Sequence, residues 1–243
     1  MDKNIVLAVI FGAAAVVGAM EEEVAEIKKY MDITSMQTIH GYTFYEGTIA
    51  NTKVVVVQGG IGKVNAAIST TLLLTNYDID FLINVGSAGG LSLSQNVGDV
   101  VISTGVLHHD VDVTAFQREL GEVPGMPRIF EPDKKALKLV ENILKDLHLS
   151  YHMGLIVSGD QFICRDDQVS QIKKNFPDAI CAEMEAASIA QVCHVFQVPF
   201  IITRSLSDIY QKGENHVQFD EYLKQASQAS AKMCYHLISI LSQ

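Results

Sequence analysis

Acidic or glycine-rich segments follow several apolar runs in this sequence. The segments are GAMEEE (18–23), GGIG (59–62), GSAGG (86–90), SGDQF (158–162), EME (183–185) and RSLSD (204–208). Carboxylates can exchange protons with a bound molecule, and glycines let backbone amides approach it closely. Ligands of α/β proteins bind beyond the carboxyl ends of strands, so we expect these segments to converge on one site. Taken singly, each has an ordinary structural explanation, such as an acidic first helical turn or a capping turn.

The apolar runs predict strands that are buried on both faces, because they are continuous stretches of Val, Ile and Leu. Segments with helical periodicity lie between them. This alternation predicts an α/β fold, a single domain with a mixed, mostly parallel central sheet flanked by helices. The expected strands cover residues 15–19, 53–58, 81–90, 99–103, 153–160 and 199–205, and the expected helices cover 63–77, 131–148, 185–196 and 219–241.

The composition is that of a folded protein that does not bind nucleic acid. The chain has 243 residues, of which 48% are hydrophobic and 19% charged, so it can bury a sizeable core. Its formal net charge of −10 is repelled by phosphate backbones, and no stripe of Lys and Arg offsets it. We expect neither nucleic acid nor a membrane as a partner.

The cysteines and histidines give no metal signature. Cys164, Cys181, Cys193 and Cys234 lack C-x-x-C spacing and are expected to be buried thiols of a reducing compartment. The HHDVD sequence at 108–112 has metal-ligand residue types without a zinc-binding spacing, so loop polarity explains it better. We therefore expect no metal and no cofactor. The irregular segment 108–130 that it opens is either a functional loop or an ordinary mobile one.

Taken together, the motifs resemble the 5′-methylthioadenosine/S-adenosylhomocysteine nucleosidases, which have the nucleoside phosphorylase-like fold. The resemblance covers the chain from about residue 14 to its C-terminus. It is carried by long motifs in the family's order: GAMEEEV, GGIGKVNAA, NVGSAGGL, DVTAF, GLIVSGDQFI, CAEMEAASIA, VPFIITRSLSD and FDEYL.

The resemblance implies hydrolysis of an adenine N-glycosidic bond by three carboxyl groups. Asp208 matches the acid that protonates adenine N7, Glu23 the carboxylate that activates water, and Glu185 the group that binds the ribose hydroxyls and stabilises positive charge on the sugar. A free aspartic acid has a pKa of about 3.9, so holding it protonated at pH 7 costs about 4 kcal/mol. A dry pocket, the bound adenine or a proton relay has to supply that energy.

The resemblance also implies the substrate-binding residues. Ser87, Glu183 and Arg204 match positions near the ribose, and Phe162 and Ile163 match positions beside adenine. Apolar side chains suit a thioether tail. The matched binding positions are Met20, Ile61, Ser87, Phe162, Ile163, Glu183, Met184, Arg204, Ser207 and Phe219, with Val113, Phe116 and Pro124 contributed by the neighbouring subunit of a homodimer.

One departure concerns the loop that reaches the neighbouring site. Arg118 stands where relatives often carry tyrosine, which leaves the preference for the 5′ substituent open. The sequence does not rank methylthioadenosine, adenosylhomocysteine and 5′-deoxyadenosine as substrates.

The uncharged N-terminal segment 4–20 admits two interpretations. It is shorter than the about 20 apolar residues of a membrane span, yet residues 13–15 resemble a signal-peptide cleavage site. Cleavage after Ala15 would shorten the first strand. Cleavage after Ala19 would delete it and detach Glu23, which the MEEE segment carries in what we expect to be the exit loop of that strand. We therefore expect a nucleosidase domain over 12–243, an extension over 1–11 and a cytoplasmic location.

Two other functions remain open. A purine nucleoside phosphorylase shares the fold but needs cationic ligands for phosphate, and Glu23 and Glu185 would repel that anion. A non-catalytic nucleoside-binding protein with the same fold is the second alternative. Such a protein would not need Glu23, Glu185 and Asp208, which this sequence keeps within the matching motifs.

Overall fold

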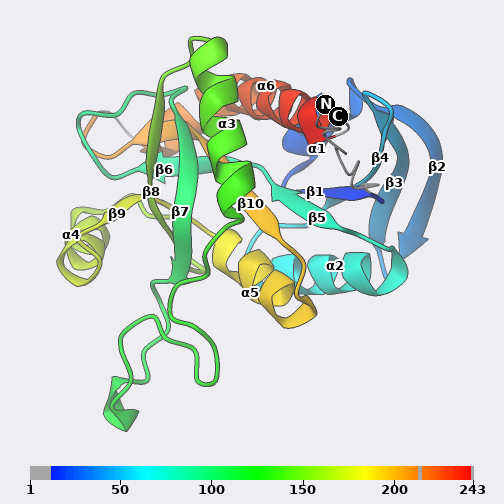
Figure 1. Ribbon diagram of the computed structural model, residues 1–243. Coiled ribbons are helices and arrows are strands. Elements are labelled where there is room, and N and C mark those ends of the chain that lie inside the picture. Colours follow the sequence, from blue (N-terminus) through cyan, green and yellow to red (C-terminus); the bar gives the residue numbers. More distant parts are fainter. Residues whose placement is uncertain (1–11, 213–214, 242–243) are drawn as a thin grey trace, which may run out of the picture.

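A central β-sheet with helices on both faces forms the framework of the protein (Figure 1). The computed structural model describes residues 12–212 and 215–241, so the expected extension over 1–11 lies outside the described residues. The strands are β1 (Ala14–Gly18), β2 (Asp32–Ile39), β3 (Tyr42–Ile49), β4 (Thr52–Gln58), β5 (Phe81–Asn84), β6 (Ser87–Gly90), β7 (Val100–His108), β8 (Tyr151–Ser158), β9 (Ala179–Glu183) and β10 (Phe200–Ile209). The helices are α1 (Glu21–Lys28), α2 (Lys63–Asn76), the short 3-10 helix Thr114–Phe116, α3 (Lys134–Asp146), α4 (Asp166–Asn175), α5 (Ala186–Phe196) and α6 (Asn215–Leu241).

The sheet is mixed and mostly parallel, as the sequence predicted, with strand order β2-β3-β4-β1-β5-β10-β6-β9-β8-β7. β1, β4 and β5 run parallel to one another, and β10 continues the parallel pairing from β5 to β6. β10 also pairs with β7 in the antiparallel direction, which closes β10, β6, β9, β8 and β7 into a ring. All ten residues of β10 are buried, because the strand belongs to both halves of the sheet.

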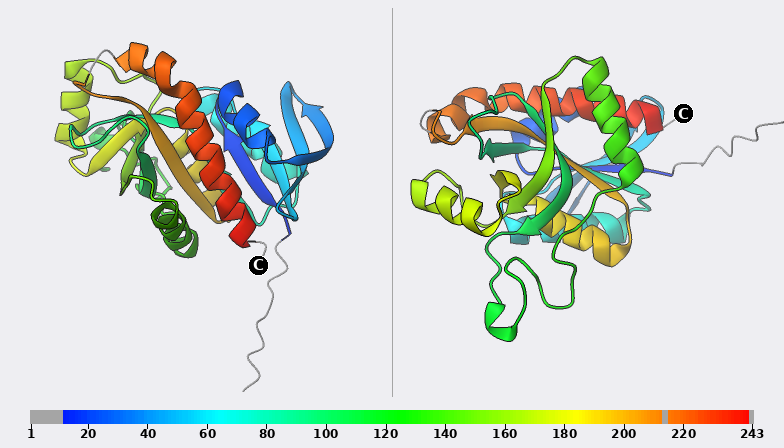
Figure 2. Two further views of the ribbon diagram at one scale, coloured as in Figure 1. Left: turned by 90° about the horizontal axis from the view of Figure 1, so that it is seen from above. Right: turned by 60° about the vertical axis from the view of Figure 1, so that its left-hand side comes forward.

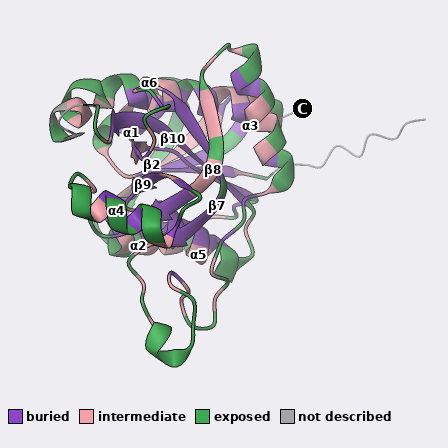
Figure 3. Ribbon diagram, turned by 90° about the vertical axis from the view of Figure 1, so that its left-hand side faces the viewer, coloured by how far each residue is buried: buried purple, intermediate pink, exposed green. Residues whose placement is uncertain are grey.

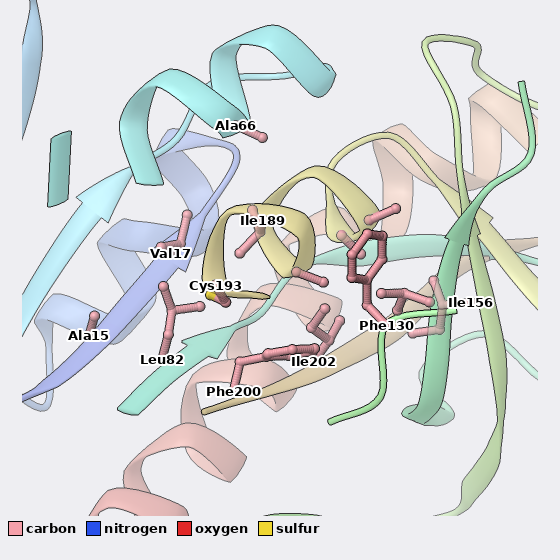
Figure 4. Packing of buried hydrophobic residues seen from close by; sticks show 14 of the residues in the cluster. Ala15, Val17, Ala66, Leu82, Phe130, Ile156, Ile189, Cys193, Phe200 and Ile202 are labelled. Carbon is pink, nitrogen blue, oxygen red and sulfur yellow. The ribbon is translucent and has the colours of Figure 1, made fainter. Parts of the chain in front are cut away.

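Two apolar layers hold the helices on the sheet. On one face, α2 and α5 cover a core in which Ala66, Ile189 and Cys193 pack against Val17, Leu82 and Ile202 of the strands (Figure 4). On the other face, apolar side chains of α1, α3 and α6 cover the sheet. Figure 3 shows the result as buried strands beneath helices with exposed outer faces.

Several sequence predictions of secondary structure were incomplete. The expected strand 81–90 divides into β5 and β6, and β7 and β10 extend beyond the predicted ends. The MEEE segment is the first turn of helix α1, not an exit loop, because three acidic residues at a helix N-terminus favour the helix. The hairpin β2–β3 and helix α4 were not predicted. β2 is exposed along nearly all its length, so it has no apolar run, and α4 buries only Val169 and Ile172.

The segment between β7 and α3 forms a long loop that projects away from the sheet (Figures 1 and 2). It contains the 3-10 helix Thr114–Phe116, whose Phe116 is 79% exposed. Three of the four cysteines are buried thiols, but Cys164 is exposed, contrary to the prediction, because it lies in the loop after β8. Within the described ranges, no helix combines the length and apolar character needed to cross a bilayer.

Candidate active site

A cavity of about 340 Å³ opens where the carboxyl ends of the strands meet α6. All thirteen site residues that the sequence assigned to a single subunit line this cavity. They are Met20, Glu23, Ile61, Ser87, Phe162, Ile163, Glu183, Met184, Glu185, Arg204, Ser207, Asp208 and Phe219. The carboxyl groups of Glu23, Glu185 and Asp208 therefore meet around one space, although up to 185 positions separate them along the chain.

Glu23 lies in the first turn of α1 and is 2% exposed. Its Oε2 accepts hydrogen bonds from the backbone N–H groups of Ala19 (2.7 Å) and Met20 (3.1 Å), and its Oε1 accepts one from that of Ser87 (3.1 Å). Burial raises the pKa of Glu23, although these N–H groups and the Arg204 guanidinium oppose the rise. Such a carboxylate is rigidly aimed and is a stronger base than an exposed one.

Glu183 and Arg204 form a buried ion pair, with 2.6 Å between Arg204 Nη2 and Glu183 Oε2. The same Nη2 donates to Asn84 Oδ1 (2.7 Å), and Nη1 donates to the carbonyl oxygen of Thr203 (2.9 Å). Arg204 Nε is buried and has no hydrogen-bond partner among the described residues. The guanidinium therefore lines the cavity as a fixed cation whose Nε–H is free to donate.

Glu183 is held from three further directions. Its Oε2 accepts the N–H groups of Glu185 (3.0 Å) and Ala186 (2.8 Å) at the start of α5, and Ser158 Oγ donates to Oε1. Ser158 Oγ in turn accepts the N–H of Ala187 (2.8 Å). The helix N-terminus and the arginine together stabilise a negative charge at Glu183.

Glu185 is buried beside these charges, and its Oε1 accepts the N–H of Gly62 (2.8 Å) at the start of α2. Burial, and then the charge of Glu183, raise the pKa of Glu185 to about 8, against the opposing effects of the Gly62 N–H and Arg204. Gly62 has a φ of +92°, a conformation that favours glycine. The GGIG turn thus supplies a backbone donor that a residue with a side chain would supply only under strain.

Asp208 reaches the cavity because β10 contains a bulge. Side chains of a regular strand alternate between its faces, yet Ser207 and Asp208 both line the cavity. The register with β6 shifts between Leu206 and Asp208, which is where the bulge redirects the side chains. Asp208 is 1% exposed and accepts the hydroxyl of Ser207 at 2.9 Å, and a Cβ added at Gly89 would lie 3.0 Å from its Oδ2.

Aromatic and aliphatic side chains form the outer wall of the cavity. The rings of Phe162 and Phe219 meet edge to face, with centroids 5.8 Å apart. Phe162 and Ile61 remain 41% and 53% exposed, so this wall faces the opening. Met20 and Met184 also line the space and add flexible apolar surface.

The three residues expected to serve a neighbouring subunit do not line this cavity. Val113, Phe116 and Pro124 lie in the projecting loop between β7 and α3. Arg118 in the same loop pairs with Glu122 at 2.8 Å and is half-exposed.

Sequence reasoning missed eight residues that line the cavity. They are Ala19, Val85, Gly86, Gly89, Gln161, Ala182, His216 and Asp220. Gly86, Gly89 and Gln161 stood in motifs that already marked the site. Asn84 and Ser158 were also missed as supports of Arg204 and Glu183. A lone Asn within the apolar run FLIN was the available signal, since a buried amide needs partners.

The arrangement suits acid–base chemistry on a small uncharged molecule. A buried acid, a carboxylate held by backbone donors, and a second carboxylate beside an ion pair surround one space with an apolar wall. Among the described residues that line it, Arg204 is the only Lys or Arg. The groups found here thus favour the formation of positive charge on a bound molecule.

Known proteins resemble this chain in both sequence and structure. Residues 13–242 match the family model described as the phosphorylase superfamily. A 5′-methylthioadenosine/S-adenosylhomocysteine nucleosidase of Bacillus subtilis is 47% identical over 92% of this chain and 97% of its own length. A nucleosidase of the same name from Neisseria meningitidis, solved with methylthio-immucillin-A, superposes with a TM-score of 0.91 at 39% identity, covering 95% of this chain and 100% of its own.

A third relative was solved with adenine. It is the 5′-methylthioadenosine/S-adenosylhomocysteine nucleosidase of Colwellia psychrerythraea, with a TM-score of 0.91, 39% identity and coverage of 95% of this chain and 96% of its own. Identity at this level over nearly the full length decides the family. The chain belongs to the phosphorylase superfamily and, within it, to the 5′-methylthioadenosine/S-adenosylhomocysteine nucleosidases.

Proposed function

We propose that this chain hydrolyses the N-glycosidic bond of 5′-methylthioadenosine and S-adenosylhomocysteine, releasing adenine and the corresponding 5-thioribose. The observation that carries the proposal is the meeting of Glu23, Glu185 and Asp208 around one buried cavity in a member of this family. Water is the second substrate. 5′-Deoxyadenosine has the same bond and a smaller 5′ group, and is a further candidate substrate.

The acid in this mechanism is Asp208. Adenine is a poor leaving group as an anion, so a proton must reach N7 as the bond breaks. The carboxyl group of Asp208 is 1% exposed, and the Ser207 hydroxyl is hydrogen-bonded to it at 2.9 Å. A carboxyl group placed here would deliver that proton to the bound base. Phe162 and Ile163, which line the same cavity, would contact the base.

Glu23 would activate the attacking water on the other side of the sugar. The N–H groups of Ala19, Met20 and Ser87 fix its two oxygens, so a water bound to it has one direction of approach. Glu185 would accept the ribose hydroxyls and stabilise the positive charge that grows on the sugar, with Glu183 and Arg204 orienting it. The apolar side chains of Met20, Ile61, Met184 and Phe219 would contact the 5′ substituent.

The proposal extends to assembly and cellular role. We infer a homodimer in which Val113, Phe116 and Pro124 of each projecting loop reach the other subunit's cavity. Phe116, in the 3-10 helix of this loop, is 79% exposed, which supports the dimer. Such an enzyme would act in the cytoplasm in methionine salvage and in recycling of the methyl cycle. Light scattering on the purified protein tests the dimer, and a monomer would contradict it.

Adenine release from methylthioadenosine, measured with and without phosphate, tests the reaction. We expect equal rates, and a strict requirement for phosphate would identify a phosphorylase instead. Asp208→Asn removes the acid while retaining the shape of the side chain. It should lower kcat by about 10²- to 10⁴-fold and leave ligand affinity largely unchanged. Turnover near the wild-type rate would refute the role of Asp208, and a wild-type protein that binds adenine without turnover would be a binding protein.

A further inference from the structure

The HHDVD motif at the root of the projecting loop contributes to a network of contacts outside the cavity. The Nζ of Lys63 lies 2.6 Å from Oδ1 of Asp110, and Oδ2 of Asp110 accepts the N–H of Asp160 at 3.1 Å. Oδ1 of Asp160 in turn accepts the N–H of Lys63 at 2.7 Å. These contacts join the start of α2, the end of β7 and the end of β8 in a closed triangle.

The Lys63–Asp110 pair is more enclosed than an ordinary surface ion pair. Its side chains are 19% and 21% exposed, whereas Lys145 and Glu141 of α3 are 54% and 27% exposed at the same N–O distance. Among the Lys and Arg pairs of the described residues, only Arg204–Glu183 has a less exposed cation. Although burial opposes it, the contacts with Lys63 and with the Asp160 N–H hold the pKa of Asp110 below its usual range. Asp110 is therefore ionised at neutral pH.

Two corners of the triangle adjoin residues that line the cavity. Gly62, which precedes Lys63, donates its N–H to Glu185 at 2.8 Å. Asp160 is followed by Gln161, Phe162 and Ile163, all of which line the cavity. A Cβ added at Gly62 would lie 3.1 Å from Asp160 Oδ1, so the two turns are in direct contact.

The third corner, Asp110, follows His109, which packs against the turn that begins at the end of β8. His109 donates its backbone N–H to the carbonyl oxygen of Ser158, and a Cβ at Gly159 would collide with the His109 ring. Burial lowers the pKa of His109, so its ring is neutral. The ends of β7 and β8 are thus fixed to each other next to Asp110.

We infer that Lys63, Asp110 and Asp160 form a positioning clamp, which keeps the Gly62 N–H on Glu185 and the segment 161–163 against the substrate. None of the three residues touches the reacting atoms, so each acts through the residues it holds. This inference rests on the proposed function, because the reaction that the clamp supports is the proposed hydrolysis. It assigns the HHDVD motif a role in catalysis in place of simple loop polarity.

The effect on Glu185 gives the clamp a specific signature. The Gly62 N–H stabilises the ionised form of Glu185, as does Arg204 of β10, whereas Glu183 of β9 and Glu23 of α1 destabilise it. If the clamp opens and Gly62 moves away, the pKa of Glu185 rises further. The acidic limb of the pH profile of kcat/KM then moves to higher pH, because activity needs the ionised form.

Lys63→Met, Asp110→Asn and Lys63→Arg test the clamp in the full-length protein. The first two should lower kcat/KM about 10- to 100-fold, the size of effect that follows a misplacement of about 1 Å. They should also shift the acidic limb upward, and the double variant should be no worse than either single one, because the pair acts as a unit. Lys63→Arg should restore most of the activity.

Lys145→Met and Glu141→Gln serve as matched controls, because they break an exposed pair of equal length on α3. Both should retain wild-type kinetics. Unchanged kcat/KM and pH limb in Lys63→Met and Asp110→Asn would overturn the inference, even if their unfolding temperatures fall.

Hydrogen–deuterium exchange on the same variants separates this inference from the proposed function. The clamp predicts faster exchange in peptides covering 59–63 and 159–163 of Lys63→Met, whether or not the wild-type protein turns over. Unchanged exchange in both segments would overturn the clamp. A wild-type protein without adenine release would refute the proposed function alone.

Discussion

Glu183→Gln tests how the charges of the site are coupled. The substitution keeps an oxygen that accepts from Arg204 and from the N–H groups of Glu185 and Ala186. It removes the negative charge and replaces the oxygen that accepts the Ser158 hydroxyl with an NH2 group. That charge is the second largest cause, after burial, of the raised pKa of Glu185, which is about 8. A neighbouring charge moves a pKa by about one to three pH units. The pKa of Glu185 should therefore fall to between about 5 and 7.

The assay is the pH profile of kcat/KM for adenine release. In the wild-type protein, the acidic limb should reflect a group that titrates near pH 8, and in Glu183→Gln it should move down by about one to three pH units. Lys63→Met, which opens the clamp, should move the same limb to higher pH. Opposite shifts in Lys63→Met and Glu183→Gln would identify Glu185 as the group that the limb reports. A limb that stays in place or moves upward in Glu183→Gln would refute the coupling.

The same variant has a predictable effect on stability. Removing one partner of a buried ion pair costs about 3–5 kcal/mol, and the lower value applies here because Glu23 and Glu185 still surround Arg204. At about 2–4 °C per kcal/mol for a chain of this size, the unfolding temperature should fall by about 6–12 °C. Glu141→Gln, which breaks an exposed pair, should lower the unfolding temperature far less. Equal falls in the unfolding temperatures of Glu183→Gln and Glu141→Gln would refute the argument that burial makes the Glu183–Arg204 pair more important for stability.

Two further predictions concern Glu185 and Asp208. The folded protein keeps a proton on Glu185 up to about pH 8, whereas the ordinary pKa is 4.5, so the folded state binds more protons between these values. The free energy of unfolding should therefore fall as pH rises through this window, and Glu185→Gln should flatten that part of the curve in urea titrations; an unchanged slope would contradict it. Gly89→Ala places a Cβ 3.0 Å from Asp208 Oδ2, and should lower kcat at least about tenfold by displacing the acid. A wild-type kcat would contradict this, as would a loss explained by unfolding in a thermal scan.

The sequence predicted those strands and site residues that a short stretch of sequence is enough to recognise. Continuous apolar runs marked β4, β8 and the beginning of β10, and the motifs at the strand ends contained twelve of the thirteen predicted residues that line the cavity, Phe219 of α6 being the exception. This succeeded because the carboxyl ends of parallel strands meet at one edge of a sheet. The exposed strand β2 was not predicted, because it contains no apolar run.

The features that the sequence did not reveal depend on tertiary contacts. The bulge that turns both Ser207 and Asp208 toward the cavity is a property of the pairing between β10 and β6. The roles of Asn84 and Ser158 likewise arise from contacts with Arg204 and Glu183, which are far away along the chain. Apart from the lone Asn84 in the apolar run FLIN, no local pattern distinguishes such residues from ordinary polar residues near a strand end.

The field in the cavity explains why water, and not phosphate, is the expected nucleophile. Arg204 already donates Nη2 to Asn84 and to Glu183, so its charge is largely matched by a carboxylate. A negative charge about 4 Å from an ionised carboxylate is disfavoured by about 4 kcal/mol at an effective dielectric constant of 20. A phosphate on the ribose side would meet Glu23 and, in the ionised form that activity requires, Glu185. The same two carboxylates stabilise a sugar that becomes positive as adenine leaves. One arrangement of charge therefore repels the rival nucleophile and lowers the energy of the transition state for hydrolysis.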